Sequence, residues 1–375
     1  MLIKDKKYSY NDVMVVPAKV SSIEHRAECD VFHKDGYLPI FTAPMSTVVN
    51  CLNYELFEQN HIHAIMPRNI DYDIRLNYAL NNKWAAFSLS EFENFFCDEG
   101  YVKEFIKKKK KVLIDIANGH MKKLFVIVKK AKRLYGETLQ IMIGNIANPF
   151  TYEEVFKCGA DYVRIGIGAG NGCITSSNTS IHYPMASLVE ETYKLKKHIA
   201  EERGIPMCDM PKIIADGGIR NYSDVIKALA LGADYVMIGS VFSQLVESAA
   251  KTYALKNENE YTIFNPFQDK IKEQDGIFYI EEDETKEVIL IGKLFKIFYG
   301  MASKEGQIDI NGEKTKTSEG IVKTLPCTTN MDKWVNNMID YLRSTMSYTD
   351  INSIYQMNKL DLILISDKTY QSVNK

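Results

Sequence analysis

Short apolar runs alternate regularly with longer amphipathic segments from about residue 38 onwards. Short apolar runs between turn residues are typical of buried strands, and apolar residues at helical spacing predict helices packed against them. The predicted strands are Leu38–Ala43, His63–Met66, Ala85–Leu89, Val112–Ile116, Gln140–Gly144, Tyr162–Gly166, Lys212–Ala215 and Tyr235–Ile238. The predicted helices include Met121–Leu134, Tyr152–Cys158, Pro184–Glu201 and Tyr222–Leu231. Eight strands separated by helices favour a (β/α)8 TIM barrel, an α/β fold, over an open doubly wound sheet.

Polar and glycine residues gather where these predicted strands end. In a barrel the carboxyl ends of all strands lie on one face, and active sites are built on that face. Gly217 and Gly218 follow the seventh strand, and Gly239 and Ser240 follow the eighth. Barrels commonly bind phosphate after these two strands, so the two pairs together predict a phosphate site.

The sixth predicted strand is followed by a loop, Gly166–Thr175, in which four glycines surround Cys173. Glycines permit an irregular loop whose backbone N–H and C=O groups approach an ion closely. A thiol in this loop would lie at the active end of a barrel, where it could serve as a nucleophile. The alternative is a tight turn with a packed cysteine, which the loop taken alone favours.

Composition excludes several classes of protein. The 375 residues carry a net charge of -2, so no general attraction to nucleic acid is expected. The first residues are too polar for a signal peptide, and no apolar run is long enough to span a membrane. The seven cysteines are scattered singly, which predicts neither a zinc site nor a disulfide framework. A reducing, cytoplasmic compartment is therefore expected.

The pattern changes after the eighth strand. We expect a helix over Val241–Leu255, and then a β-hairpin insertion over residues 257–297, formed by Gly276–Ile280 and Glu287–Ile291 on top of the barrel. The polar stretch Ala302–Ser318 reads as a loop, and residues 302–320 are predicted to form an active-site flap. A final helix is expected over Asp332–Leu342, and the tail 366–375 is expected to be disordered. The whole chain, 1–375, is thus predicted to be a single catalytic barrel domain.

Ten motifs, in order along the chain, resemble those of the IMP dehydrogenase/GMP reductase family over nearly the whole length. They are Tyr10–Pro17, Ser21–Glu28, Asp115–Gly119, Gly144–Asn145, Gly166–Thr175, Ala215–Gly218, Ile238–Ser240, Phe298–Met301, Ser318–Gly320 and Leu342–Ser344. The resemblance implies a barrel enzyme that acts on a purine mononucleotide. It further implies that Cys173 attacks the purine C2 and forms a covalent thioimidate, which divides one difficult displacement into two easier steps.

The resemblance also implies the binding residues. The substrate would contact Asn171, Asp216, Gly217, Gly218, Gly239, Ser240, Tyr299, Gly300, Met301, Lys316, Ser318 and Gly320. Within this set Asp216 would hold the ribose hydroxyls, because a carboxylate accepts from both. The dinucleotide cofactor, NADPH, would contact His25, Arg26, Arg68, Asp115, Ile116, Ala117, Asn118, Gly166 and Ser344. A monovalent cation, K+, would bind backbone carbonyls of Gly166, Gly168, Cys173 and Ser176. Family members usually assemble as homotetramers, and the same is expected here.

The two branches of the family differ in the chemistry at C2. The dehydrogenase hydrolyses its thioimidate with an arginine–aromatic pair in the flap, and Ala302–Ser318 contains neither an arginine nor an aromatic residue. The reductase expels ammonia with a threonine–glutamate pair, which Thr175 and Glu319 match. No regulatory module interrupts the barrel. The resemblance therefore favours the reductase reaction, in which GMP and NADPH give IMP, ammonia and NADP.

The chain departs from the family pattern at several positions. The family's arginine after the cysteine is Ser176 here, and its histidine–lysine pair on the second strand is Met66 and Pro67, with Arg68 as a cationic substitute. The family's flap arginine is Lys316, which keeps the charge but loses the planar fork. Two alternatives stay open: an IMP dehydrogenase that lacks its regulatory module, and an inactive nucleotide-binding barrel.

Overall fold

The structure is a computed structural model. It describes residues 5–98, 100–101, 107–257, 260–264, 271–274, 277–281, 288–312 and 315–373.

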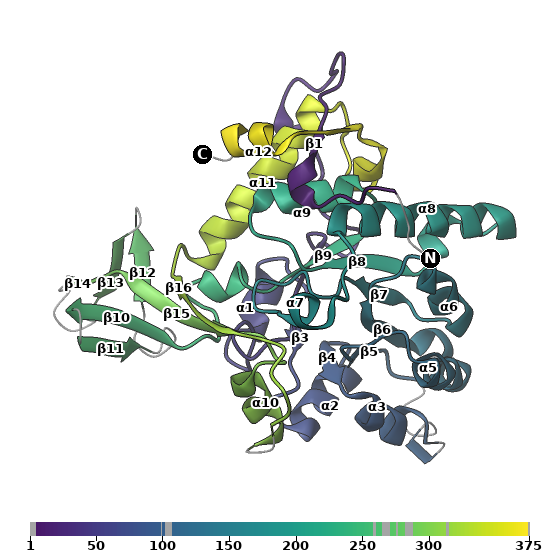
Figure 1. The fold of residues 1–375 in the computed structure, drawn as a ribbon, viewed down its shortest axis with the longest axis horizontal. Coiled ribbons are helices and arrows are strands. Elements are labelled where there is room, and N and C mark those ends of the chain that lie inside the picture. Colours follow the sequence, from purple (N-terminus) through teal and green to yellow (C-terminus); the bar gives the residue numbers. More distant parts are fainter. Residues whose placement is uncertain are drawn as a thin grey trace.

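Eight parallel strands form one sheet at the centre of the molecule (Figure 1). They are β2 (Ile40–Thr42), β3 (Ile65–Met66), β4 (Trp84–Phe87), β5 (Lys110–Asp115), β6 (Leu139–Ile146), β7 (Tyr162–Ile165), β8 (Lys212–Asp216) and β9 (Tyr235–Ile238). Their order is β2-β9-β8-β7-β6-β5-β4-β3, and hydrogen bonds between β2 and His63, just before β3, bring the two edges together. The predicted (β/α)8 TIM barrel is therefore confirmed.

Helices surround this sheet (Figure 1). They are α1 (Tyr54–Gln59), α2 (Tyr72–Leu80), α3 (Leu89–Phe96), α5 (Lys122–Tyr135), α6 (Thr151–Cys158), α8 (Met185–Arg203), α9 (Tyr222–Ala230) and α11 (Met331–Tyr348). Helix α5 shows why the sequence pattern works. Leu124, Ile127, Val128 and Ala131 recur at helical spacing and are buried, while lysines occupy the other face. The apolar stripe thus fixes which side of each helix packs on the barrel.

The barrel has an apolar core on each side of its wall. In β5, Val112 and Ile114 belong to the cluster between strands and helices, whereas Leu113 belongs to the cluster inside the barrel. Neighbouring residues of a strand point to opposite faces, so an uninterrupted apolar run is needed to fill both. The interior is closed by large side chains such as Phe41 and Trp84, which makes it a packed core rather than a pore.

The prediction of a helix over Val241–Leu255 is wrong. The structure has a 3₁₀ turn at Phe242–Gln244 and then the strand β10 (Thr252–Asn257). The carbonyl oxygen of Ser240 accepts hydrogen bonds from the side chains of Ser243 (2.8 Å) and Gln244 (3.0 Å). Side chains that bond nearby backbone in this way compete with helix formation. Further on, β10 gains strand partners on both sides, which the local pattern does not reveal.

Two small antiparallel sheets extend from one side of the barrel, at the left of Figure 1. One contains β11 (Glu260–Phe264), β10, β15 (Leu294–Tyr299) and β16 (Val322–Pro326), in that order. The other contains β12 (Ile271–Gln274), β13 (Ile277–Glu281) and β14 (Val288–Gly292). The expected hairpin is the antiparallel pair β13–β14, but it is one part of a larger sheet arrangement. The assignment of residues 1–375 to one domain stays a prediction.

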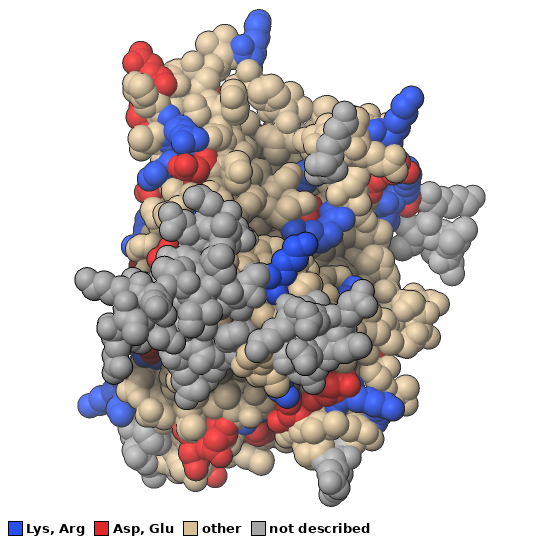
Figure 2. Space-filling view, turned by 90° about the vertical axis from the view of Figure 1, so that its left-hand side faces the viewer, with Lys and Arg blue, Asp and Glu red and all other residues tan. Residues whose placement is uncertain are grey.

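Two further segments differ from expectation. The stretch 302–320 is not a loop throughout, because it contains helix α10 (Lys304–Asn311). The Ser303 side chain caps this helix by accepting from the Gly306 N–H, and Gly312 follows its last residue with a φ of 67°. The tail, expected to be disordered, forms the helix α12 (Asp367–Val373). Among the described residues, the α-helices and strands also include α7 (Thr175–Thr179) and the antiparallel pair β1 (Val13–Val15) and β17 (Leu362–Leu364). Both basic and acidic side chains are exposed on the face shown in Figure 2. None of the described helices combines the length and apolar character needed to cross a bilayer.

His33 makes the stability of this fold dependent on pH. Its ring stacks on Tyr355 (5.0 Å between centroids) and meets the edge of Tyr235 (4.7 Å) at the start of β9. Burial lowers the pKa of His33 from 6.5 to about 4. Between these values the unfolded chain binds a proton that the folded chain excludes, so stability falls as the pH falls from 6.5 towards 4.

We expect His33→Gln to remove this part of the pH dependence, which amounts to a change in the free energy of unfolding on the order of 2 kcal/mol between pH 6.5 and pH 4. Urea unfolding of the wild type and the variant near pH 6.5 and near pH 4 measures it. The exposed His198→Gln serves as the matched control and should keep the wild-type slope. Identical slopes for wild type and His33→Gln would show that His33 does not set the pH dependence.

Candidate active site

The loop after β7 is held close to the end of β8. Gly166, its first residue, has a φ of 129°, and a side chain there would place Cβ 2.2 Å from the carbonyl oxygen of Asp216. Only glycine combines this backbone conformation with such a close approach. The loop therefore runs along the carboxyl end of the barrel strands and delivers Cys173 to that face.

The flap completes the site by pairing with the cysteine loop. Cys173 and Gly320 form an antiparallel bridge, flanked by hydrogen bonds from Ile174 N to Glu319 O (2.9 Å) and from Ile321 N to Gly172 O (3.0 Å). This backbone pairing brings together segments that are about 150 residues apart in the sequence. Glu319 is thereby placed beside the start of α7.

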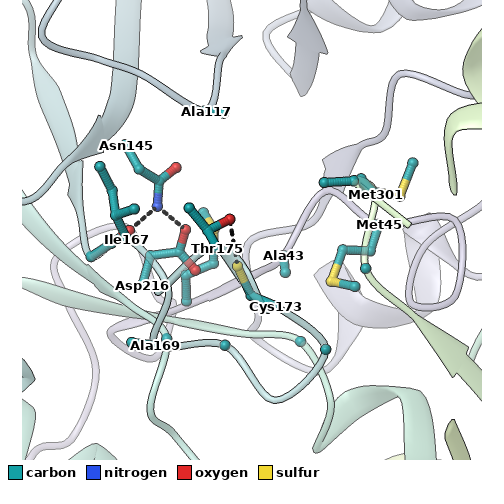
Figure 3. A pocket seen from close by; sticks show the side chains of 18 of the residues that line it. Ala43, Met45, Ala117, Asn145, Ile167, Ala169, Cys173, Thr175, Asp216 and Met301 are labelled. Carbon is teal, nitrogen blue, oxygen red and sulfur yellow. Dashed lines mark hydrogen bonds between the residues drawn. The ribbon is translucent and has the colours of Figure 1, made fainter. Parts of the chain in front are cut away.

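Cys173, Thr175 and Glu319 form a continuous chain of hydrogen bonds. The Cys173 thiol donates to Thr175 Oγ1 (3.2 Å), and the Thr175 hydroxyl donates to Glu319 Oε2 (2.6 Å). Figure 3 shows the side chains of Cys173 and Thr175 turned towards each other at the cavity. The arrangement joins a nucleophilic sulfur to a carboxylate through one hydroxyl, so a proton can pass along it.

These residues open into a cavity of about 350 Å³. That volume is in the range of small-molecule and cofactor sites. The predicted residues that line it are Cys173, Thr175, Glu319, Asn171, Asp216, Gly217, Gly218, Gly239, Ser240, Gly300, Met301, Arg68, Asp115, Ile116, Ala117, Gly166 and Gly168. The structure thus brings together the ends of several strands, the cysteine loop and the flap at one place.

Other predicted residues lie near this cavity without lining it. Ser318 Oγ donates to the carbonyl of Gly320 (2.7 Å), and Tyr299 Oη donates to Asp309 (2.8 Å). Lys316 is exposed and its backbone N–H donates to Gln307. Asn118 is exposed in a turn in which its side chain accepts from His120 N (3.1 Å).

His25, Arg26 and Ser344 do not line the cavity either. Arg26 donates to Ser344 Oγ (3.1 Å) and forms an ion pair with Asp340 (3.2 Å), and both of these partners are residues of helix α11. Arg26 and Asp340 are both more than half exposed, and such pairs contribute little stability. A role for these residues in binding a dinucleotide stays a prediction.

Sequence reasoning missed a buried arginine at the centre of the site. Arg164 on β7 donates to Asp115 Oδ1 (2.6 Å) and, through two nitrogens, to Asp216 Oδ2 (3.1 and 2.8 Å). Asn145 adds a bond to the same Asp216 oxygen (2.6 Å), visible in Figure 3. Although burial disfavours the charged guanidinium, the carboxylates of Asp216 and Asp115 raise the pKa of Arg164. A charged residue inside an apolar strand run was the available signal, because buried arginines require partners.

The wall opposite the polar groups is apolar. Met45, Met301 and Phe298 line the cavity together with Met237, and Figure 3 shows Met45 and Met301 adjacent to each other. Thioethers and aromatic rings are polarizable and make favourable contacts with flat rings. The cavity therefore offers an apolar surface for a planar group and hydrogen-bonding groups for a polar one.

Three of the four carbonyl groups predicted to bind K+ accept hydrogen bonds within the protein. Gly166 O accepts from Asn145 Nδ2 (2.8 Å), Gly168 O accepts from Ser176 Oγ (3.1 Å), and Ser176 O accepts from Ser180 N (3.0 Å). Each of these carbonyls retains a second lone pair. Cation binding here stays a prediction, and we derive no chemical step from it.

Comparison with known proteins adds independent findings. The model of the "IMP dehydrogenase / GMP reductase domain" matches residues 100–265. The chain is 26% identical to a GMP reductase of Staphylococcus carnosus, over 97% of this chain and 98% of that protein. It is 25% identical to human GMP reductase 1, over 95% and 94%, and 26% identical to a GMP reductase of Helicobacter pylori, over 97% and 98%.

Proposed function

We propose that this chain is a GMP reductase that converts GMP to IMP and ammonia with NADPH, because residues 100–265 match the model of the IMP dehydrogenase / GMP reductase domain and the chain is 26% identical to a GMP reductase over nearly its whole length. The observation that carries the proposal is the hydrogen-bonded series Cys173–Thr175–Glu319 at the cavity. A reductase needs a proton donor for the leaving amine beside the nucleophile, and this series supplies both. The flap segment Ala302–Ser318 holds no arginine or aromatic residue that would activate water instead.

We assign the chemistry at C2 to these residues. The Cys173 thiol passes its proton through Thr175 to Glu319, and the sulfur attacks C2 of the purine to form a C–S bond, while the electron pair of the breaking C–N bond leaves with the amino group. Thr175, backed by Glu319, returns that proton to the amine, which departs as ammonia. NADPH would supply, when bound, the hydride that takes the place of the amino group at C2, and the Cys173 sulfur would leave C2 as the thiolate. Each role follows from the placement of a donor or acceptor at the sulfur.

The same cavity accounts for binding of the substrate. Backbone groups at Gly217, Gly218 and Gly239 would receive the 5′-phosphate at the ends of β8 and β9. One oxygen of Asp216 already accepts three hydrogen bonds from Asn145 and Arg164, which orients the other for the ribose hydroxyls. The purine would lie on the apolar wall that includes Met45.

Arg68 fits the expected dinucleotide. It lines the cavity beside Asp115, donates to the Asp115 carbonyl (3.4 Å), and its Nε is buried without a hydrogen-bond partner among the described residues. A buried donor of this kind is costly unless something binds it, and a phosphate oxygen would satisfy it. We propose that Arg68, with Asp115–Ala117, holds NADPH. Homotetramer formation and K+ are parts of the proposal that rest on the family resemblance, and a cytoplasmic location rests on the seven scattered cysteines.

A two-way cofactor assay tests the proposed reaction. We expect the purified protein to consume NADPH in the presence of GMP and to release IMP and ammonia, followed by the absorbance of the reduced cofactor. Reduction of NAD with IMP, without NADPH consumption, would identify a dehydrogenase instead. Binding of GMP with no turnover in either direction would identify an inactive nucleotide-binding barrel.

A further inference from the structure

Helix α10 is attached to the barrel by one carboxylate. Asp309 Oδ2 accepts hydrogen bonds from Ser46 Oγ in the loop after β2 (2.7 Å) and from Tyr299 Oη at the end of β15 (2.8 Å). Bonds to an ionised acceptor are about twice as strong as neutral ones. Together with burial, the Asp309 bond raises the pKa of Tyr299 to about 12, so the phenol stays a donor at neutral pH. One side chain on α10 thus joins the helix to the end of β15, ten residues earlier, and to the loop after β2, 263 residues earlier.

The rest of α10 packs on the segment just before the flap. A side chain at Gly306 would place Cβ 2.6 Å from Gly300 O and from Met301 Cα, so the helix rests directly on this backbone. The backbone N–H of Ser46 donates to Met301 Sδ (3.4 Å), which connects the loop after β2 to this segment as well. Met301, Ala302 and Ile310 all line the cavity. The position of α10 therefore shapes one wall of the site.

The position of α10 also affects the position of Glu319, the catalytic glutamate of the proposed reaction. The Gln307 side chain accepts from Lys316 N (2.6 Å) and donates to the carbonyls of Ala302 (3.1 Å) and Thr317 (3.4 Å). Glu319 N donates to Ala302 O (3.0 Å). The segment that carries Glu319 is thus held by α10 on one side and by the cysteine loop on the other.

We infer that Asp309 is a positioning residue, which holds α10 on the loop after β2 and thereby keeps Glu319 at Thr175. It touches neither the cavity nor the reacting atoms, because Asp309 is not among the residues that line the cavity. Its effect on catalysis rests on the proposed function, but its effect on the position of the helix does not. Glu305, an exposed acid one turn earlier on α10, has no hydrogen-bond partner among the described residues.

Trypsin measures whether the helix is held, because the exposed Lys304 is the first residue of α10 and the exposed Lys316 follows the helix. We expect Asp309→Ala to increase the rate of cleavage after Lys304 and after Lys316 about five- to tenfold. In Glu305→Ala, which removes the same charge, cleavage after Lys316 should stay at the wild-type rate; cleavage after Lys304 is not compared in this variant, because Glu305 is the residue that follows it. Ser46→Ala should accelerate cleavage as well. In the double variant the cleavage rate should increase by less than the product of the two single increases. Equal cleavage of Asp309→Ala and wild type would overturn the inference.

Kinetics supply the second readout. In the assay of GMP reduction, Asp309→Ala should lower kcat about tenfold, because Glu319 acts in the chemical step, and should raise KM for GMP by a smaller factor, because α10 also shapes one wall of the cavity. Asp309→Glu, which keeps the acceptor, should recover part of the rate. Faster cleavage of Asp309→Ala, together with no reductase activity in the wild type, would refute the proposed function and leave the role of Asp309 in place. Unchanged cleavage of Asp309→Ala, together with reductase activity in the wild type, would refute the role of Asp309 and leave the proposed function in place.

Discussion

Replacement of Cys173 by alanine should abolish turnover of GMP while nucleotide binding survives. The thiol is half-buried at the cavity, and its one described side-chain partner is Thr175. Removing the sulfur removes the atom that would form the covalent bond to C2, but leaves the glycines and Asp216 that would hold the phosphate and ribose. We expect a loss of roughly 10³-fold or more in kcat, with the dissociation constant of GMP within a small factor of the wild-type value.

NADPH consumption and calorimetric titration of GMP measure the two quantities separately. The exposed Cys51→Ala is the matched control, and it should behave as the wild type. Mass spectrometry of acid-quenched wild-type enzyme should find the nucleotide on Cys173 during turnover. Full activity of Cys173→Ala would show that another group acts on the substrate, and would remove the basis for the proposed mechanism.

Replacement of Arg164 by methionine should weaken both halves of the site at once. Arg164 is 8% exposed in its side chain, and the carboxylates that it joins are 19% exposed at Asp115 and 17% at Asp216. Without the guanidinium two partly buried carboxylates face each other with no charge to balance them. Removing one partner of a buried ion pair costs about 3–5 kcal/mol. We expect a thermal midpoint lower by several degrees and increases of at least about tenfold in KM for both GMP and NADPH.

The simultaneous increase of both KM values distinguishes Arg164 from a residue that contacts one ligand. Arg133→Met, the same exchange at an exposed position of α5, should leave stability and kinetics unchanged. Arg164→Lys should be intermediate, since an ammonium group cannot donate to both carboxylates with the geometry of the guanidinium fork. A thermal midpoint and KM values equal to those of the wild type would show that the ion pairs do not organise the site.

The barrel could be predicted from the sequence because the patterns that mark its strands and helices are local. All eight strands and the four quoted helices were placed within a few residues, since a buried strand needs an apolar run and a surface helix needs an apolar stripe. The same reasoning failed after β9. There the outcome depends on pairing between β10 and β15, whose residues are about 40 positions apart. Helix α10 was missed because its residues show no regular apolar spacing, and its capping serine was the remaining local sign.

Strand and helix periodicity are enough to place residues at the ends of the barrel strands. Asp216 and the glycines after β8 and β9 follow from them, and so does the start of the loop that carries Cys173. The family resemblance, not the local pattern, predicted the pairing of Thr175 with Glu319, and folding brings their side chains within 2.6 Å. The contacts of Arg164 with Asp115 and Asp216, and of Asp309 with Ser46, could be found in the folded chain alone. These contacts form between segments brought together by folding, and no local propensity encodes which distant side chain will lie within hydrogen-bonding distance.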